Sequence, residues 1–183
     1  MPLGAARFGL SGAELGKLEL IQTITASADS FISFTSIDES IYNVHFLTFA
    51  LTNFSGGAMV VELSNDGGST YENSGYQRAS QFGSVGGTFG EDKTTSSLNF
   101  GDFGSANSGN GKNGYMYMYN LGDSSKYSFS TYQAFNEHPT LTHYMAFGSA
   151  VRTTTEVNNA VRINPLGGFN CTGVASLYGI KES

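Results

Sequence analysis

The residues that most often carry catalysis are scarce and widely separated in this sequence. It contains three histidines and one cysteine among 183 residues. His138 and His143 flank an expected loop-to-strand junction, which does not hold two side chains in the geometry of a metal site. No H-E-x-x-H or C-x-x-C motif occurs, and no Gly-x-Ser-x-Gly sequence precedes a helix. We therefore expect no catalytic residue, no metal ligand, no cofactor and no enzymatic activity.

Two glycine-rich segments imitate ligand-binding motifs. Residues 109–114 (GNGKNG) match G-x-G-x-x-G, but the dinucleotide motif requires a following helix, whereas residues 115–119 (YMYMY) alternate like a strand. Residues 65–70 (NDGGST) resemble a calcium loop, but they lack its regular acid spacing and terminal Glu. Both segments are typical of turns. The second one predicts a hairpin that returns through residues 71–82.

The other reactive side chains have ordinary structural explanations. Two carboxylates can hydrolyse a glycosidic bond, but the acid pairs 38–39 and 91–92 are sequence neighbours in expected turns, where solvated acids are common. A β-sandwich glycan hydrolase is therefore the weakest functional hypothesis. His45 and Cys171 lie within apolar strand patterns. These patterns favour a buried core histidine and a small buried hydrophobic residue.

Charge and hydropathy exclude two classes of partner. The formal net charge is −6, and no two of the nine Lys and Arg residues are adjacent. A nucleic-acid partner is not expected, because the basic patch that would bind phosphates is missing. No apolar run is long enough to cross a membrane, so no membrane partner is expected either. The first residues lack the apolar core of a signal peptide, which predicts synthesis in a cytoplasm.

Strand-forming residues and glycine turns dominate the elements that must position any site. The sequence has 24 Gly, 14 Phe and 10 Tyr, only three Pro, and no helical periodicity. We predict an all-β fold, a single-domain, jelly-roll-like antiparallel β-sandwich of about ten strands over residues 17–183. Residues 42–52 are apolar on both faces, which predicts a central strand covered on both sides. Residues 83–114, with nine glycines, are predicted as a long Gly-rich loop.

The last part of the chain is expected to close the sandwich. Residues 157–163 and 169–180 alternate as two strands around a glycine turn at residues 164–168. The alternation divides the apolar residues of the second strand between two faces, with Cys171, Ala175 and Leu177 on one and Val174, Tyr178 and Ile180 on the other.

An extended N-terminal arm, residues 1–16, precedes the predicted sandwich. Its scattered apolar residues, among them Phe8 and Leu10, cannot bury enough surface to order the arm by itself. We expect the arm to dock on a neighbouring subunit or on another protein. The Gly-rich loop 83–114 is a second expected interface element.

A tyrosine face is the third expected interface element. Tyr115, Tyr117 and Tyr119 project from one side of a strand, and Met116 and Met118 project from the other. Tyrosine is enriched in protein interfaces and can also stack on sugars. A third interpretation is that the methionines enter the core while the tyrosines merely cover the outside of the sheet.

Three segments resemble structural proteins of tailed bacteriophages, including marine and cyanobacterial phages. Residues 53–76 (NFSGGAMVVELSNDGGSTYENSGY) are similar to a strand that ends in Ser, a D-G-G turn and a tyrosine-containing strand. Residues 158–180 (NNAVRINPLGGFNCTGVASLYGI) are similar to the closing strands and G-x-x-x-LYGI ending of these proteins. Residues 31–49 also fit, so the resemblance covers about half of the chain.

The resemblance implies a jelly-roll-like domain that assembles in virions and carries no catalytic residues. It leads to the hypothesis of a capsid decoration or cement protein, a homotrimer that contacts the major capsid protein or other virion proteins and resides in the virion. The alternative is a tail-fibre or receptor-binding module that uses the tyrosine face to bind a host-surface glycan.

Overall fold

The structure is a computed structural model that describes five parts of the chain: residues 17–52, 58–105, 111–136, 143–168 and 170–181. The arm 1–16, with Phe8 and Leu10, lies outside the described residues, as does His138. The described parts consist of strands, turns and irregular connections, and none of them forms a helix that could cross a membrane.

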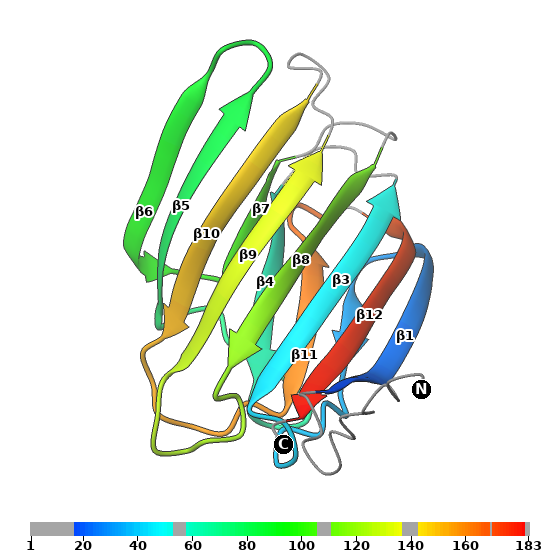
Figure 1. Ribbon diagram of the computed structural model, residues 1–183, viewed down its shortest axis with the longest axis vertical. Helices are drawn as coiled ribbons and strands as arrows, with labels where there is room; N and C mark the ends of the chain where they lie inside the picture. The colour runs from blue at the N-terminus through cyan, green and yellow to red at the C-terminus, as the bar shows by residue number, and fades with distance from the viewer. Residues whose placement is uncertain (1–16, 53–57, 106–110, 137–142, 169, 182–183) are drawn as a thin grey trace, which may run out of the picture.

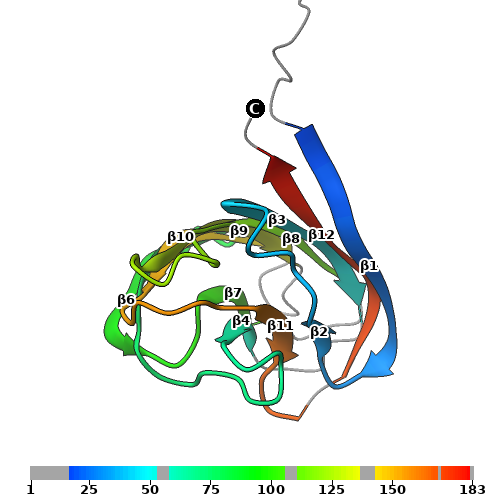
Figure 2. The same ribbon diagram turned by 90° about the horizontal axis from the view of Figure 1, so that it is seen from below.

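Within the described residues, twelve strands form two antiparallel sheets (Figure 1). The larger sheet has eight strands in the order β1-β12-β3-β8-β9-β10-β5-β6, and the smaller has four in the order β2-β11-β4-β7. Figure 2 shows the eight-stranded sheet curving around the four-stranded sheet, which covers its inner face. The strands are β1 (Lys17–Asp29), β2 (Ile32–Phe34), β3 (Val44–Thr52), β4 (Ala58–Ser64), β5 (Tyr76–Ser84), β6 (Phe89–Ser97), β7 (Gly101–Ser105), β8 (Lys112–Tyr119), β9 (Ser128–Asn136), β10 (Tyr144–Arg152), β11 (Ala160–Pro165) and β12 (Cys171–Lys181).

The all-β, jelly-roll-like antiparallel sandwich predicted from the sequence is confirmed, with twelve strands in place of about ten. Its core lies between the sheets and contains Leu47, Phe49, Phe103, Met116 and Met118, all of them buried. The two methionines therefore face inward, and the tyrosines between them face outward. This is the arrangement that the alternation of residues 115–119 predicts.

The prediction of a long loop over residues 83–114 is wrong. This stretch contains β6, β7 and the start of β8. β6 is the polar edge of the larger sheet, and it is held by backbone pairing with β5 and by an ion pair between Arg78 and Asp92. Glycine, serine and threonine made the stretch resemble a loop. Pairing with a neighbouring strand outweighs this weak local preference.

The prediction of a hairpin after residue 64 is also wrong. β4 belongs to the small sheet and β5 to the large one, so residues 65–75 cross between the sheets. The local turn chemistry is as expected, since Gly67 and Gly68 have φ values of 74° and 87°. Asp66 accepts hydrogen bonds from the Thr70 hydroxyl (2.6 Å) and backbone N–H (2.9 Å). These bonds lower the pKa of Asp66 to about 2.

The C-terminal strands confirm one expectation and correct another. Cys171, Ala175 and Leu177 are buried, whereas Val174 and Tyr178 face outward, as the alternation predicts. However, β11 and β12 do not pair with each other. β11 lies between β2 and β4 in the small sheet, and β12 lies between β1 and β3 in the large sheet.

β3 occupies a central position in the large sheet, between β12 and β8. The expectation that both of its faces are covered is wrong for the described residues. Its inner residues, including His45, Leu47 and Phe49, are buried, but Phe46 and Ala50 point away from the small sheet. The second apolar face of β3 is therefore surface rather than core.

His45 is a buried core histidine, as expected. Its Nε2 atom lies 2.7 Å from the carbonyl oxygen of Ile37, to which the neutral ring donates a hydrogen bond. Nδ1 is buried and has no hydrogen-bond partner among the described residues. Burial lowers the pKa of His45, because a second proton would place a charge in the apolar interior.

His45 is expected to make the protein less stable at mildly acidic pH. Its pKa is lower in the folded than in the unfolded chain, so stability is fully present above about pH 6.5 and falls as the pH drops below that value. The free energy of unfolding is expected to fall by at most about 1.4 kcal/mol per pH unit because of His45. Urea unfolding between pH 7.5 and pH 5 measures it. His45→Gln should flatten the profile in this window, and an unchanged slope in the variant would contradict the assignment.

Candidate interaction face

The candidate interaction face is the outer face of the eight-stranded sheet, which points away from the four-stranded sheet. Alternation along each strand sends every second side chain outward. The pairing registers then align these side chains into rows that run across β1, β12, β3, β8 and β9 to β10. Residues that are far apart in the sequence become direct neighbours in this way.

Two adjacent rows form an apolar and aromatic surface, which we call the aromatic band. The first row runs from Leu18 on β1 to Val151 on β10, and the second runs from Leu20 on β1 to Tyr117 on β8. The aromatic band consists of Leu18, Leu20, Val44, Phe46, Tyr117, Tyr119, Phe129, Val151, Tyr178 and Ile180.

Phe46 is at the centre of the band. Its ring centroid lies 4.6 Å from that of Tyr117, 6.0 Å from that of Tyr115 and 6.2 Å from that of Tyr178. Tyr115 is tied down further, because its hydroxyl donates a 2.7 Å hydrogen bond to Oε1 of Gln133 on β9. The rings support one another, so a partner would meet a platform that is already ordered.

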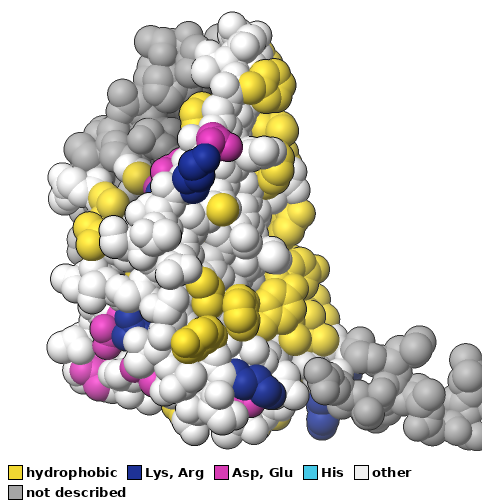
Figure 3. Space-filling model, turned by 90° about the vertical axis from the view of Figure 1, so that its left-hand side faces the viewer, with side chains coloured by type: hydrophobic (Ala, Val, Ile, Leu, Met, Phe, Trp, Pro, Cys, Tyr) yellow, Lys and Arg dark blue, Asp and Glu magenta, His cyan; other side chains and the backbone are white. Residues whose placement is uncertain are grey.

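The margins of the band are open. Leu18 is 50% exposed, Leu20 is 59% exposed and Phe129 is 45% exposed, and no described residue covers them. Single exposed apolar residues are ordinary, but a contiguous group of them marks an interaction surface. Figure 3 views the sheet from its β6 side and shows hydrophobic side chains gathered along the edge formed by this outer face.

The centre of the outer face is also free of charge. Neither the two rows of the band nor the next two outward rows, which contain Tyr115 and Phe135, include Asp, Glu, Lys or Arg on β1, β12, β3, β8, β9 or β10. Outward charges first occur on the edge strand β6, at Glu91 and Lys93. These charges protect the edge against unwanted pairing. The sheet centre lacks such protection, and depletion of charge is the signature of an interface core.

The β1 end of the band projects beyond the body of the sandwich. Figure 2 shows the start of β1 and the end of β12 extending as a two-stranded ribbon. Leu18 and Ile180 are paired on this ribbon. The opposite face of this ribbon is held to the rest of the sandwich, because the Tyr42 hydroxyl donates a 2.7 Å hydrogen bond to Glu19 on β1. This bond lowers the pKa of Glu19, so the carboxylate remains charged and the contact persists at neutral pH.

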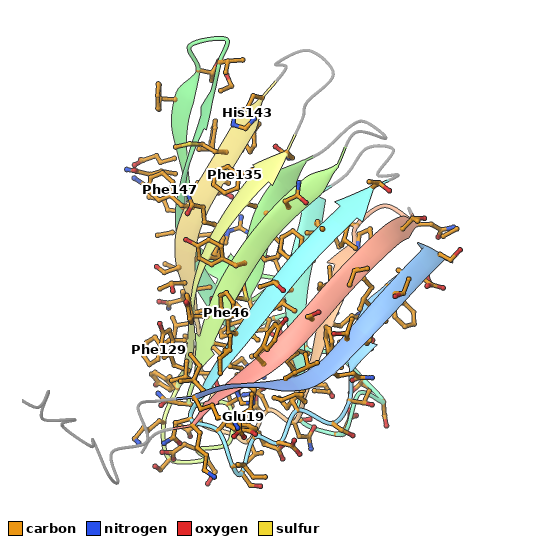
Figure 4. All side chains as sticks on the ribbon, turned by 45° about the vertical axis from the view of Figure 1, so that its right-hand side comes forward. Glu19, Phe46, Phe129, Phe135, His143 and Phe147 are labelled. Carbon is orange, nitrogen blue, oxygen red and sulfur yellow. The ribbon has the colours of Figure 1, made fainter. Side chains whose placement is uncertain are left out.

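A second apolar group lies toward the other end of the same face. Phe135 is 37% exposed and Phe147 is 42% exposed, and the ring of His143 stacks on Phe135 with centroids 6.4 Å apart. In Figure 4 these three residues lie at one end of the sheet, and Phe46 and Phe129 lie nearer the other. His143 is thus part of an aromatic contact.

A shallow groove borders the band where β9, β10, β5 and β6 run side by side. Its volume is about 860 Å³. Outward residues from all four strands line it: Phe129, Thr131, Ser149, Val151, Gln77 and Lys93. The groove combines one aromatic ring with hydroxyl, amide and ammonium groups.

The structure places three of the five predicted site residues together. Tyr115, Tyr117 and Tyr119 share the outer face, whereas Phe8 and Leu10 lie outside the described residues. Phe46 and Tyr178 were missed as site residues, because only strand pairing brings them beside Tyr117. The alternation placed Tyr178 on the face opposite Cys171, whereas Phe46 was expected to be covered because residues 42–52 are apolar on both faces. Among the described residues, no group of three His, Cys, Asp or Glu side chains could hold a metal ion.

Comparisons with known proteins identify no family. No protein-family model matches the sequence, and no curated protein matches it. Among solved structures, the fold is similar to the galectin LEC-6 of Caenorhabditis elegans, with 13% identity over 85% of this chain and 94% of the galectin and a TM-score of 0.35. A fructofuranosidase of Schwanniomyces occidentalis is similar at 5% identity, over 90% of this chain and 34% of the enzyme, with a TM-score of 0.21. Similarities this low carry no functional argument.

Proposed function

We propose that this protein is a structural component of a bacteriophage virion that acts by protein–protein contacts, as a decoration or cement protein of the head. The observation that carries the proposal is the ordered, charge-free aromatic band on the outer face of the large sheet. The virion setting rests on the resemblance of residues 53–76 and 158–180 to phage structural proteins. No catalytic residue is required for this role.

The occupant that we propose for the band is another copy of the same chain, in a homotrimer. Residues near a rotation axis meet their own counterparts in the neighbouring subunits, so any charge there would face its like. The band avoids this repulsion, since its polar groups are tyrosine hydroxyls. Phe46, Tyr117 and Tyr178 supply the large, pre-ordered rings that anchor interfaces.

The assembly state and the location of the protein test the proposal together. Light scattering after size exclusion, at micromolar concentration, is expected to give three times the chain mass of 19.4 kDa. Cryo-electron microscopy of the phage particle should then place the trimer on the head. A monomer at all concentrations, with no density on the particle, would reject both parts. A trimer located on the tail would agree with the band as the assembly surface but would contradict the role of a head cement protein.

A receptor- or glycan-binding module is the second candidate, and the groove beside the band favours it. Phe129 could stack on a sugar ring while Thr131, Ser149 and Gln77 bind its hydroxyl groups. The absence of Trp from the sequence weighs against this candidate. A glycan-array signal that Gln77→Ala, in the groove but outside the band, abolishes in a correctly assembled protein would favour it over the cement role.

A further inference from the structure

Lys112 and Asn136 face each other inside the sandwich. They are direct partners in the antiparallel register of β8 and β9. Both occupy inward positions of their strands. Lys112 points to the same side of β8 as Met116 and Met118, and Asn136 points to the same side of β9 as Ala134. Directly opposite residues on one face have Cβ atoms about 5 Å apart, so the Lys112 amine can reach the side-chain carbonyl carbon of Asn136.

Both side chains are buried inside the sandwich. Lys112 is 0% exposed and Asn136 is 3% exposed. The buried Leu51 is opposite Lys112 on β3, and Tyr144 is opposite Asn136 on β10. Lysine is among the residues that are least often fully buried, and its presence at this position calls for a chemical reason.

The environment makes the lysine a nucleophile. Burial lowers the pKa of Lys112 to about 7, and the nearby charge of Asp102 on β7 partly opposes this shift. The neutral amine is therefore far more populated at neutral pH than in an exposed lysine, which is almost entirely protonated. A desolvated neutral amine is the form that attacks a carbonyl carbon.

We propose that Lys112 and Asn136 form an intramolecular isopeptide bond that covalently joins β8 to β9. The Nζ atom of Lys112 attacks Cγ of Asn136, and the Cγ–Nδ2 bond breaks. One proton moves from Nζ to the departing nitrogen, which leaves as ammonia. No oxidant, cofactor or second protein is consumed. Asp102 is the candidate to carry the proton between the two nitrogens, because its charge acts on the Lys112 amine, although its carboxylate is also ion-paired with Arg78 at 3.0 Å.

The mass of the intact, folded protein tests the bond directly. The wild-type chain is expected to be lighter than its sequence mass by one ammonia, about 17 Da. Trypsin should not cleave after the modified Lys112, so digestion should yield residues 94–126 covalently joined to residues 127–152. A folded wild-type protein that keeps its full sequence mass after prolonged incubation at pH 7.5 would overturn the proposal. Lys112 would then be held by ionic contacts alone.

Variants test whether the ammonia is lost in a reaction between these two residues. Lys112→Met and Asn136→Ala are both expected at their full sequence masses, whereas Lys93→Met, an exposed lysine on β6, should still lose ammonia. If either core variant fails to fold, the wild-type mass and the joined tryptic peptide still decide the question. Asp102→Asn should slow the mass loss during refolding. An unchanged rate would remove Asp102 from the proton transfer while leaving the bond in place.

Discussion

Tyr117→Asp is expected to convert the assembled protein to monomers while the sandwich remains folded. Tyr117 packs against Phe46 in the middle of the aromatic band, and its half-buried ring faces outward. The substitution places a carboxylate where no charge now exists. In an assembly, symmetry brings these carboxylates close together. Loss of an aromatic anchor costs at least about 2 kcal/mol, which weakens association about 30-fold.

Sedimentation or light scattering across a concentration series measures this effect, and thermal unfolding checks the fold. Tyr127→Asp is the matched control, because Tyr127 is 45% exposed but lies in the turn between β8 and β9, outside the band. It should assemble like the wild-type protein. If Tyr117→Asp assembles normally, or if both variants dissociate equally, the band is not the interface.

Gly173→Ala is expected to be strongly destabilising. Gly173 lies in β12 between β1 and β3 and has a φ of 134°, a conformation that residues with a side chain rarely adopt. A Cβ atom there would lie 2.2 Å from the carbonyl oxygen of Ala50 and 3.0 Å from Cα of Leu51. Both contacts are backbone atoms of β3, which cannot yield without breaking the ladder. A loss of about 3–5 kcal/mol is expected, and for a chain of this size it lowers Tm by roughly 10 °C.

Differential scanning calorimetry measures the loss, and Gly87→Ala separates its two causes. Gly87 also has a positive φ, 85°, but a Cβ atom there would meet nothing within 4 Å. The control therefore tests backbone strain alone, which costs about 1 kcal/mol. Equal Tm values for the two variants would mean that the close approach of β12 to β3 does not limit stability.

Properties that depend on a single strand could be predicted from the sequence. The inward methionines and outward tyrosines of residues 115–119 follow from the two-residue period of one strand. The same holds for the inward Cys171 and the outward Tyr178, and for the core position of His45. The all-β fold also follows from local composition. In each case, the information lies within a few consecutive residues, because alternation is a property of the strand backbone itself.

The strand partners were decided only by the tertiary structure. Residues 83–114 resembled a loop, yet β6 and β7 form there because neighbouring strands supply their hydrogen bonds. The turn after β4 had hairpin chemistry, yet it crosses between sheets, because the chain before and after it is paired with other strands. Local propensities of this size are small compared with the energy of pairing and burial.

The features of the candidate site also separate into those that a single strand determines and those that strand pairing determines. The sequence by itself determined that Tyr115, Tyr117 and Tyr119 share a face, but it placed Lys112 in the predicted loop 83–114 rather than in a strand. It did not determine that Phe46 and Tyr178 lie beside Tyr117 or that Lys112 faces Asn136, because each of these neighbours is set by a register between separate strands. A register shifted by one residue would turn every one of these side chains to the opposite face. The aromatic band and the lysine–asparagine pair therefore exist only in the folded sheet, where burial of the inner face selects one register.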